Sequence, residues 1–263
     1  SYVYNSPGIL YGFVFVSIFM NVFSYWYSDK IVLKMYRAQP VTNESHPDLY
    51  NSVENLSITA GLPMPRVYVI PDAQPNAFAT GRNKEHAAVA VTSGLLQILN
   101  KSELEGVLAH ELAHIGNRDT LISTVVVVLV GFVTLLSDFF LRSRLHVGSD
   151  RDSRAGLVLM IVGIVLAILS PIVATIIQLA ISRKREFLAD ASGALMTRYP
   201  EGLASALEKI SAYSGQPMAR ANHATAHLFI SNPFGNIGRG VGKLFMTHPP
   251  VEERIKILRG MDH

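Results

Sequence analysis

The sequence predicts a mainly helical protein with a small β-sheet, an α+β fold that includes integral transmembrane helices. Three observations lead to this prediction. Hydrophobic residues make up 49% of the 263 residues, which is too apolar for an ordinary soluble enzyme. Long uncharged runs interrupt the chain. Between these runs, amphipathic helical patterns alternate with short strand patterns that are bounded by glycine and proline.

The uncharged runs predict where the chain crosses a bilayer, because a spanning helix needs about 20 apolar residues. Residues 1–30 and 157–182 each contain such a run and are expected to be transmembrane helices. Residues 120–141 are expected to form another, although Asp138 lies near their far end and a buried or re-entrant helix is the alternative. Residues 142–156 then form the loop between the last two segments.

Basic residues flank the apolar segments, so the net charge of +3 indicates a membrane surface and not a nucleic-acid partner. Cysteine is absent, which excludes disulfides and thiolate metal ligands. With three spans, more Lys and Arg residues fall on the side of the larger soluble parts, which favours a cytoplasmic position for that side. The residues on that side are Lys30, Lys34, Arg37, Arg118, Arg183, Lys184 and Arg185, against Arg142, Arg144, Arg151 and Arg154 on the other.

Two soluble stretches complete the chain, residues 31–119 and residues 183–263. A glycine-rich part of the second, residues 235–243, lacks the residues of a phosphate-binding loop, so no nucleotide is expected. Periodicity and turn residues predict the elements of both stretches. These are helices at Asp48–Ala60, Glu201–Tyr213 and Val251–Arg259, and strands at Arg66–Ile70, Asn76–Gly81 and Ala87–Val91.

The clearest chemical signal is the run His110-Glu111-Leu112-Ala113-His114. On a helix, positions i and i+4 share one face, so both histidines can bind one metal ion with Glu111 beside it. Glu186 is the expected third ligand, and Asp190, one turn further, is expected to accept the second N–H of a ligand histidine. Two His and one Glu leave a coordination position open for water, which is typical of catalytic zinc. One Zn²⁺ per chain is therefore expected.

The helix that carries this run is expected to begin with a capping box formed by Ser102 and Glu105, and to end at Gly116. Glu186 follows Ile181 by five residues, which is about 7.5 Å along a continuous helix. The metal site is therefore expected at the membrane surface.

Several ordered motifs resemble the HtpX-type membrane zinc metalloproteases, which are related to the CaaX prenyl-protein endopeptidases. The resemblance covers nearly the whole chain and implies a gluzincin, a zincin-type metalloprotease domain with a small sheet. HtpX-type members usually carry four hydrophobic segments and this chain shows three, so an amino-terminal span is expected to be missing from it. The motifs are His110–His114 with Asp119, Glu186–Asp190, Asn76–Ala79, Ala226–Ile230, and Thr247–Pro250 with Glu253 and Arg254.

The resemblance implies an endopeptidase that cleaves misfolded or surplus membrane proteins at the cytoplasmic face of a prokaryotic inner membrane. Zinc held by His110, His114 and Glu186 is expected to polarise the scissile carbonyl, and Glu111 is expected to act as the general base. The remaining roles are implied by the resemblance alone. His248 and Arg254 would stabilise the oxyanion, and the strand of Asn76, Ala77, Phe78 and Ala79 would hold the substrate backbone.

Two other functions remain open at this point. A CaaX-type prenyl-protein endopeptidase would share the chemistry, and turnover of a prenylated peptide would identify it. A non-catalytic membrane adaptor would keep zinc for folding only, although the intact Glu111 argues against it. The run Ala77–Ala79 also has two interpretations, a buried core strand or an exposed edge that pairs with an extended peptide.

Overall fold

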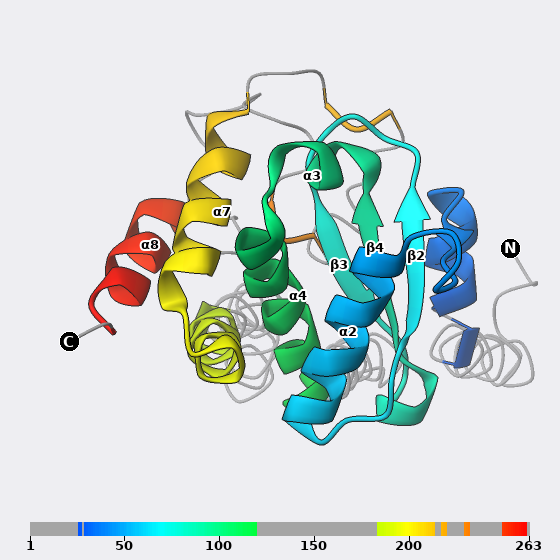
Figure 1. Cartoon of the computed structure of the whole chain (residues 1–263), viewed down its shortest axis with the longest axis horizontal. Coiled ribbons are helices and arrows are strands. Elements are labelled where there is room, and N and C mark those ends of the chain that lie inside the picture. The colour runs from blue at the N-terminus through cyan, green and yellow to red at the C-terminus, as the bar shows by residue number, and fades with distance from the viewer. Residues whose placement is uncertain are drawn as a thin grey trace, which may run out of the picture.

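The computed structural model describes residues 26–27, 29–119, 183–213, 217–219, 229–231 and 249–261. In these residues, helices surround one small sheet, which confirms the predicted combination of helices and sheet (Figure 1). None of the helices formed by these residues has both the length and the apolar character needed to cross a bilayer. The apolar segments 120–141 and 157–182, the loop between them and most of segment 1–30 lie outside the described residues.

The sheet has four strands in the order β1-β2-β4-β3. β2 runs parallel to β4, and β3 pairs with β4 in the antiparallel direction, so β3 lies at one edge. Each of the three predicted strands is confirmed to within one residue at either end. The strands are β1 (Gln39–Pro40), β2 (Arg66–Ile70), β3 (Ala77–Thr80) and β4 (Ala88–Thr92).

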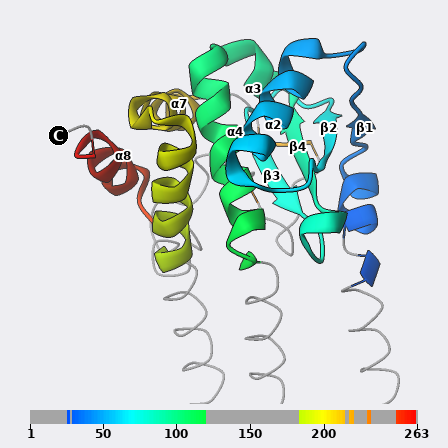
Figure 2. The same ribbon diagram turned by 60° about the horizontal axis from the view of Figure 1, so that its bottom comes forward.

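Helices α2 (Pro47–Ala60) and α4 (Lys101–Gly116) cover one face of the sheet, and the short α3 (Ser93–Ile98) leads from β4 into α4 (Figures 1 and 2). α2 ends as predicted at Gly61, whose φ of 63° lies in the left-handed region that glycine adopts without strain. The main hydrophobic core forms between these helices and this face of the sheet. The motif His110–His114 is thus on a helix that is buried along much of its length.

The opposite face of the sheet is covered by helical residues 29–35 and the residues that follow them. Tyr36, Phe78 and Phe229 form an aromatic cluster there, in which the ring of Phe229 lies 5.0 Å from each of the other two ring centres in edge-on geometry. Phe78 and Phe229 are fully buried. Phe78 therefore anchors the edge strand β3 in a second core.

α4 begins two residues earlier than the sequence predicts, and the expected Ser102–Glu105 capping box is wrong. Asn100 is the N-cap, and its side chain accepts a hydrogen bond from the Glu103 N–H, while the Glu103 carboxylate accepts one from the Asn100 N–H. Glu103 is fixed in this position because it also accepts hydrogen bonds of 2.8 Å from Ser205 and Lys209 of α7. Tertiary contacts therefore select the cap.

α7 (Pro200–Ala212) and α8 (Val251–Arg259) confirm the two C-terminal helix predictions, and helical residues 183–197 run beside α4 (Figure 2). Gly193 permits this close packing. A Cβ atom at Gly193 would lie 3.0 Å from the backbone nitrogen of His110. The two helix backbones can approach only because no side chain intervenes, and this brings Glu186 and Asp190 to the histidines of α4.

Candidate metal centre

The structure brings the three predicted ligands together. His110 and His114 come from α4, and Glu186 comes from the neighbouring helical residues 183–197. The two Nε2 atoms are 3.1 Å apart. The carboxylate of Glu186 lies 3.7 Å from the Nε2 of His110 and 3.5 Å from that of His114.

These donor atoms fit a metal ion. Ligands bound tetrahedrally at about 2.0–2.1 Å from zinc lie about 3.3 Å from one another, close to the three separations in this site. Both histidines direct Nδ1 at a carboxylate, so each Nδ1 carries the proton and each Nε2 presents a lone pair. Two lone pairs and a carboxylate facing one another repel, and a cation between them removes that repulsion.

The first supporting group, the His110 arm, consists of His110, Asp190 and Arg254. Asp190 Oδ1 lies 2.9 Å from His110 Nδ1, and Arg254 donates hydrogen bonds to both Asp190 oxygens at 2.8 and 2.6 Å. All three side chains are 2% exposed or less. Burial lowers the pKa of His110 to about 4, which keeps the ring neutral and able to bind metal. Burial alone would raise the pKa of Asp190, but the nearby Arg254 charge and hydrogen bonds lower it to about 2.

The second supporting group, the His114 arm, consists of His114, Asp119 and Arg185. Asp119 Oδ2 lies 2.5 Å from His114 Nδ1, and Arg185 pairs with the other Asp119 oxygen. Sequence reasoning gave Asp119 no role and expected Arg185 among the basic residues that flank apolar segments. The signals that could have identified the pair are an acid five residues after the second histidine and an arginine directly before the ligand Glu186.

Glu111 lies beside the histidines and points toward β3. Its carboxylate accepts a hydrogen bond from the backbone N–H of Ala79. Its side chain is nearly inaccessible to solvent, and burial raises the pKa of Glu111 to about 7, with the charge of Glu186 adding to the rise. A carboxyl group with a pKa near neutrality can both accept and return a proton.

The run Ala77–Ala79 lies in the edge strand β3, directly after Asn76, and Ala77 and Phe78 are fully buried, as expected of a core strand. Pairing of this run with an extended peptide stays a prediction. The Asn76 side chain exchanges hydrogen bonds with the backbone of Ser231, and Ile230 N–H donates to the Ala77 carbonyl at 3.0 Å. The segment 229–231 therefore covers the Asn76 end of the strand. Ala79, at the other end, lies next to Glu111.

Of the two residues implied in oxyanion stabilisation, the structure describes Arg254 but not His248. His248 lies outside the described residues. Arg254 is in the site, but its guanidinium contacts Asp190 on one side and lies 3.5 Å from Glu186 on the other. Arg254 therefore contacts the carboxylates of Asp190 and Glu186 and holds them in position.

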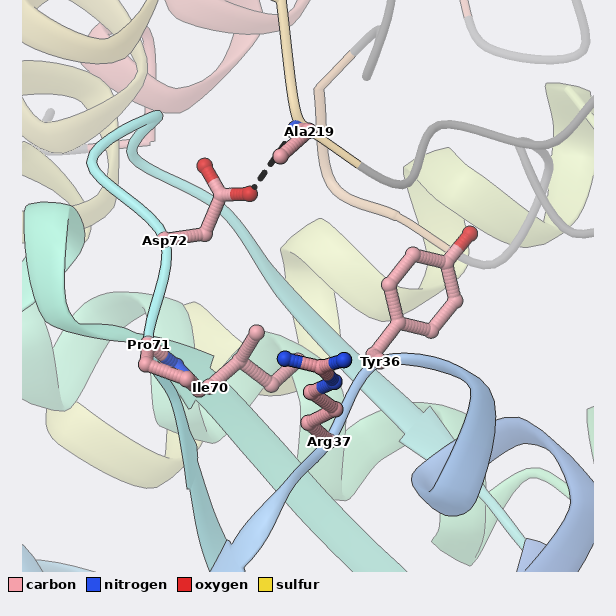
Figure 3. A pocket seen from close by; sticks show the side chains of 6 residues that line it. All are labelled: Tyr36, Arg37, Ile70, Pro71, Asp72 and Ala219. Carbon is pink, nitrogen blue, oxygen red and sulfur yellow. Dashed lines mark hydrogen bonds between the residues drawn. The ribbon is translucent and has the colours of Figure 1, made fainter.

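A separate hollow of about 460 Å³ lies between the turn at Tyr36 and the loop that follows β2 (Figure 3). Asp72 points across it and accepts a hydrogen bond of 3.1 Å from the Ala219 N–H. The predicted site residues are not among those that line this hollow, so it does not belong to the metal centre. The lining residues are Tyr36, Arg37, Ile70, Pro71, Asp72 and Ala219.

Comparisons with known proteins agree with this geometry. The model of peptidase family M48 matches residues 43–262. A "Protease HtpX homolog" of Syntrophobacter fumaroxidans is 53% identical over 98% of this chain and 91% of its own length. A protein of the same description from Pyrococcus furiosus is 54% identical over 93% of this chain and 83% of its own.

The crystal structure of S. mikatae Ste24p has a similar fold. It superposes with a TM-score of 0.61 over 95% of this chain, at 20% sequence identity. This chain spans 58% of the length of that protein. At this level of identity, the likeness concerns the fold alone.

Proposed function

The chain belongs to peptidase family M48 and is a metalloprotease. From this premise we propose that it is a zinc endopeptidase that acts at a membrane and cleaves misfolded or surplus membrane proteins. The observation that carries the proposal is the triangle of His110, His114 and Glu186 with Glu111 beside it. Zinc is the proposed metal because a two-histidine, one-glutamate set with an open position is typical of catalytic zinc.

The chemistry follows from the residues around the triangle. A zinc ion bound there would polarise the scissile carbonyl and acidify the attacking water. Glu111 accepts the proton of that water and passes it to the leaving amine nitrogen, for which its pKa near 7 is suited. Burial of Glu111 and His110 keeps bulk water away from this proton transfer.

We assign the substrate backbone to the strand Asn76–Ala79, at its Ala79 end. Asn76 and Ala77 already bond to residues 230 and 231, so their part is to support the strand. Ala79 lies in β3 and contacts Glu111. An extended peptide that paired with this end of the strand would therefore place the scissile carbonyl group of the peptide near Glu111. His248 remains the proposed oxyanion group, and Arg254 is assigned to positioning of Asp190 and Glu186.

The membrane part of the proposal is supported by the sequence. The described ranges that carry the site end at residue 119 and resume at residue 183, and these two residues directly adjoin the apolar segments 120–141 and 157–182. From the family resemblance and the distribution of Lys and Arg residues, the proposed location is a prokaryotic inner membrane with the site on the cytoplasmic face, in contact with lipid and with membrane-protein substrates. No nucleic acid or nucleotide partner is proposed.

Incubation of the detergent-purified chain with an unfolded membrane protein tests the function. We expect cleavage with zinc present and none after chelation, restored when zinc is added back. A farnesylated C-terminal peptide serves as the second substrate. Cleavage of that peptide alone would favour the CaaX-type alternative, and zinc binding without cleavage of either substrate would favour the adaptor.

A further inference from the structure

We propose that Asp119 and Arg185 position His114 for metal binding and lock the end of α4 to the start of helical residues 183–197. The inference rests on the proposed binding of a metal and requires no particular substrate. Within the described part of the chain, His114 Nδ1 pairs with Asp119 Oδ2, at a distance of 2.5 Å. With its Nδ1 proton held there, the ring directs the Nε2 lone pair toward His110 and Glu186.

The ring of His114 needs this support more than that of His110. His114 lies in the last turn of α4, and its side chain is 20% exposed, against 1% for His110. Packing therefore restricts its rotation less. A carboxylate on Nδ1 fixes both the tautomer and the direction of the ring, and it increases the basicity of the ligating nitrogen.

A turn in the backbone directly before Asp119 places this residue beside His114. α4 ends at Gly116, and Arg118 has a φ of 57°, in the left-handed region. This conformation costs an ordinary residue about 1 kcal/mol or more and persists where other contacts require it. Asp119 directly follows this turn and contacts the histidine five residues before it.

Arg185 completes the arrangement and joins two helices. Its guanidinium pairs with Asp119 and also donates a hydrogen bond of 2.9 Å to the carbonyl of Asn117, at the C-terminal end of α4. Since Arg185 directly precedes Glu186 in the sequence, one side chain connects the helix of the third ligand to the helix of the first two. The His114 arm thereby repeats the histidine–aspartate–arginine order of the His110 arm.

Zinc affinity of the full chain in detergent tests the proposal. Asp119→Ala and the isosteric Asp119→Asn should each bind zinc about 10- to 100-fold more weakly in competition with a chelator. The visible absorption spectrum of the cobalt-substituted protein should change as well, because the geometry around the metal changes. Arg185→Gln should show a smaller loss, and Arg185→Lys should recover part of it.

Glu105→Gln is the matched control, because Glu105 lies on the same helix and, among the described residues, its only ion pair is the one with Lys101 at 4.0 Å. It should leave affinity and spectrum unchanged. Wild-type affinity and spectrum in both Asp119 variants would overturn the positioning role while leaving the proposed metal function intact. A wild-type chain that binds no zinc would instead contradict the proposed function.

The helix lock is tested without metal by a double-mutant cycle on the unfolding temperature. Asp119→Asn and Arg185→Gln should be non-additive, because each removes the same contact. Additive effects would overturn the lock, whatever the metal affinity.

Discussion

The two histidines of the site are held by the same sequence of groups in two different environments. In the His110 arm, the histidine, aspartate and arginine side chains are 1%, 1% and 2% exposed. In the His114 arm, the corresponding side chains are 20%, 13% and 14% exposed. The first arm is built across α4, residues 183–197 and α8, whereas the second lies at the two helix ends that adjoin the apolar segments. The same histidine–aspartate–arginine arrangement is thus buried in the core in the His110 arm and lies next to the apolar segments in the His114 arm.

The difference indicates how each arm contributes. The buried carboxylate of Asp190 must keep its arginine, since an unpaired charge in a dry environment is costly. Asp119 and Arg185 are partly accessible to water, so the cost of separating them is lower. We therefore expect loss of the His110 arm to lower both stability and metal affinity strongly, and loss of the His114 arm to lower metal affinity with a smaller effect on stability.

The largest expected effect belongs to a residue of neither arm. Glu111→Gln should retain one zinc per chain because all three ligands and both arms remain, yet it should lose the general base. The expected loss in kcat is about 10²- to 10⁴-fold. Peptidase assays with zinc analysis of the same sample measure both quantities. Near wild-type turnover would contradict the role of Glu111, and loss of zinc would show that Glu111 belongs to the ligand-supporting groups.

The next largest effect separates the arms. Arg254→Ala leaves the Asp190 charge buried without its main partner and should destabilise the metal-free chain by about 3–5 kcal/mol. Arg185→Ala should cost about 1 kcal/mol or less, because water can solvate Asp119. Thermal unfolding of the two variants gives the comparison. Equal losses would show that the exposure of the arms does not decide their contribution to stability.

Burial of the site also predicts a pH dependence. The pKa of Glu111 is raised from an ordinary 4.5 to about 7 in the folded chain, so ionisation of this carboxyl group favours the unfolded state. The penalty is absent below about pH 4.5, grows as pH rises, and is complete above about pH 7, where it reaches about 3 kcal/mol.

Glu111→Gln carries no such charge and reports this penalty in the metal-free protein. Its unfolding temperature should match that of the wild type near pH 4.5 and exceed it increasingly up to pH 7. Added zinc should reduce the difference, because a nearby cation stabilises the carboxylate. A difference that is constant with pH would show that Glu111 is not ionising within this window.

The comparison of the arms also shows where sequence reasoning ends. The i and i+4 spacing of His110 and His114 lies within one helix, so periodicity alone placed both on one face. Asp190 was accessible to the same reasoning, because it lies one helical turn from Glu186. Asp119 belongs to the same motif but received no role, because its contact depends on the left-handed turn at Arg118 and on Arg185, which is distant in sequence.

The same limit explains the errors elsewhere. Asn100 and Ser102 are both good N-cap residues, and the choice between them depends on the hydrogen bonds that α7 makes to Glu103. Asn76 was expected in the substrate strand from the family resemblance, and this stays a prediction. Its side chain hydrogen-bonds the backbone of Ser231, 155 residues away, a contact that local patterns do not reveal. Local patterns predicted elements and ligands, whereas contacts between distant segments decided which polar groups remain available.

A further expected effect concerns the packing that brings the arms together. A Cβ atom at Gly193 would lie 3.0 Å from the His110 nitrogen and 3.2 Å from the Ala109 carbonyl carbon, both of them backbone atoms of a buried helix. Gly193→Ala should therefore push residues 183–197 away from α4, at a cost of about 1–3 kcal/mol. Because Glu186 and Asp190 move with that helix while Asp119 stays with α4, zinc affinity should fall as well.

Gly116→Ala is the matched control for this substitution. It also adds one methyl group to a helix of the site, but the nearest atom is a flexible Leu62 side-chain carbon at 3.8 Å. Alanine favours helix over glycine, so the stability of this variant should be unchanged or slightly higher. If both variants unfold at the wild-type temperature and bind zinc with wild-type affinity, the close approach at Gly193 is not what sets the distance between the ligand helices. A loss in Gly193→Ala alone would mean that the metal site depends on the spacing of the helices as well as on the two arms.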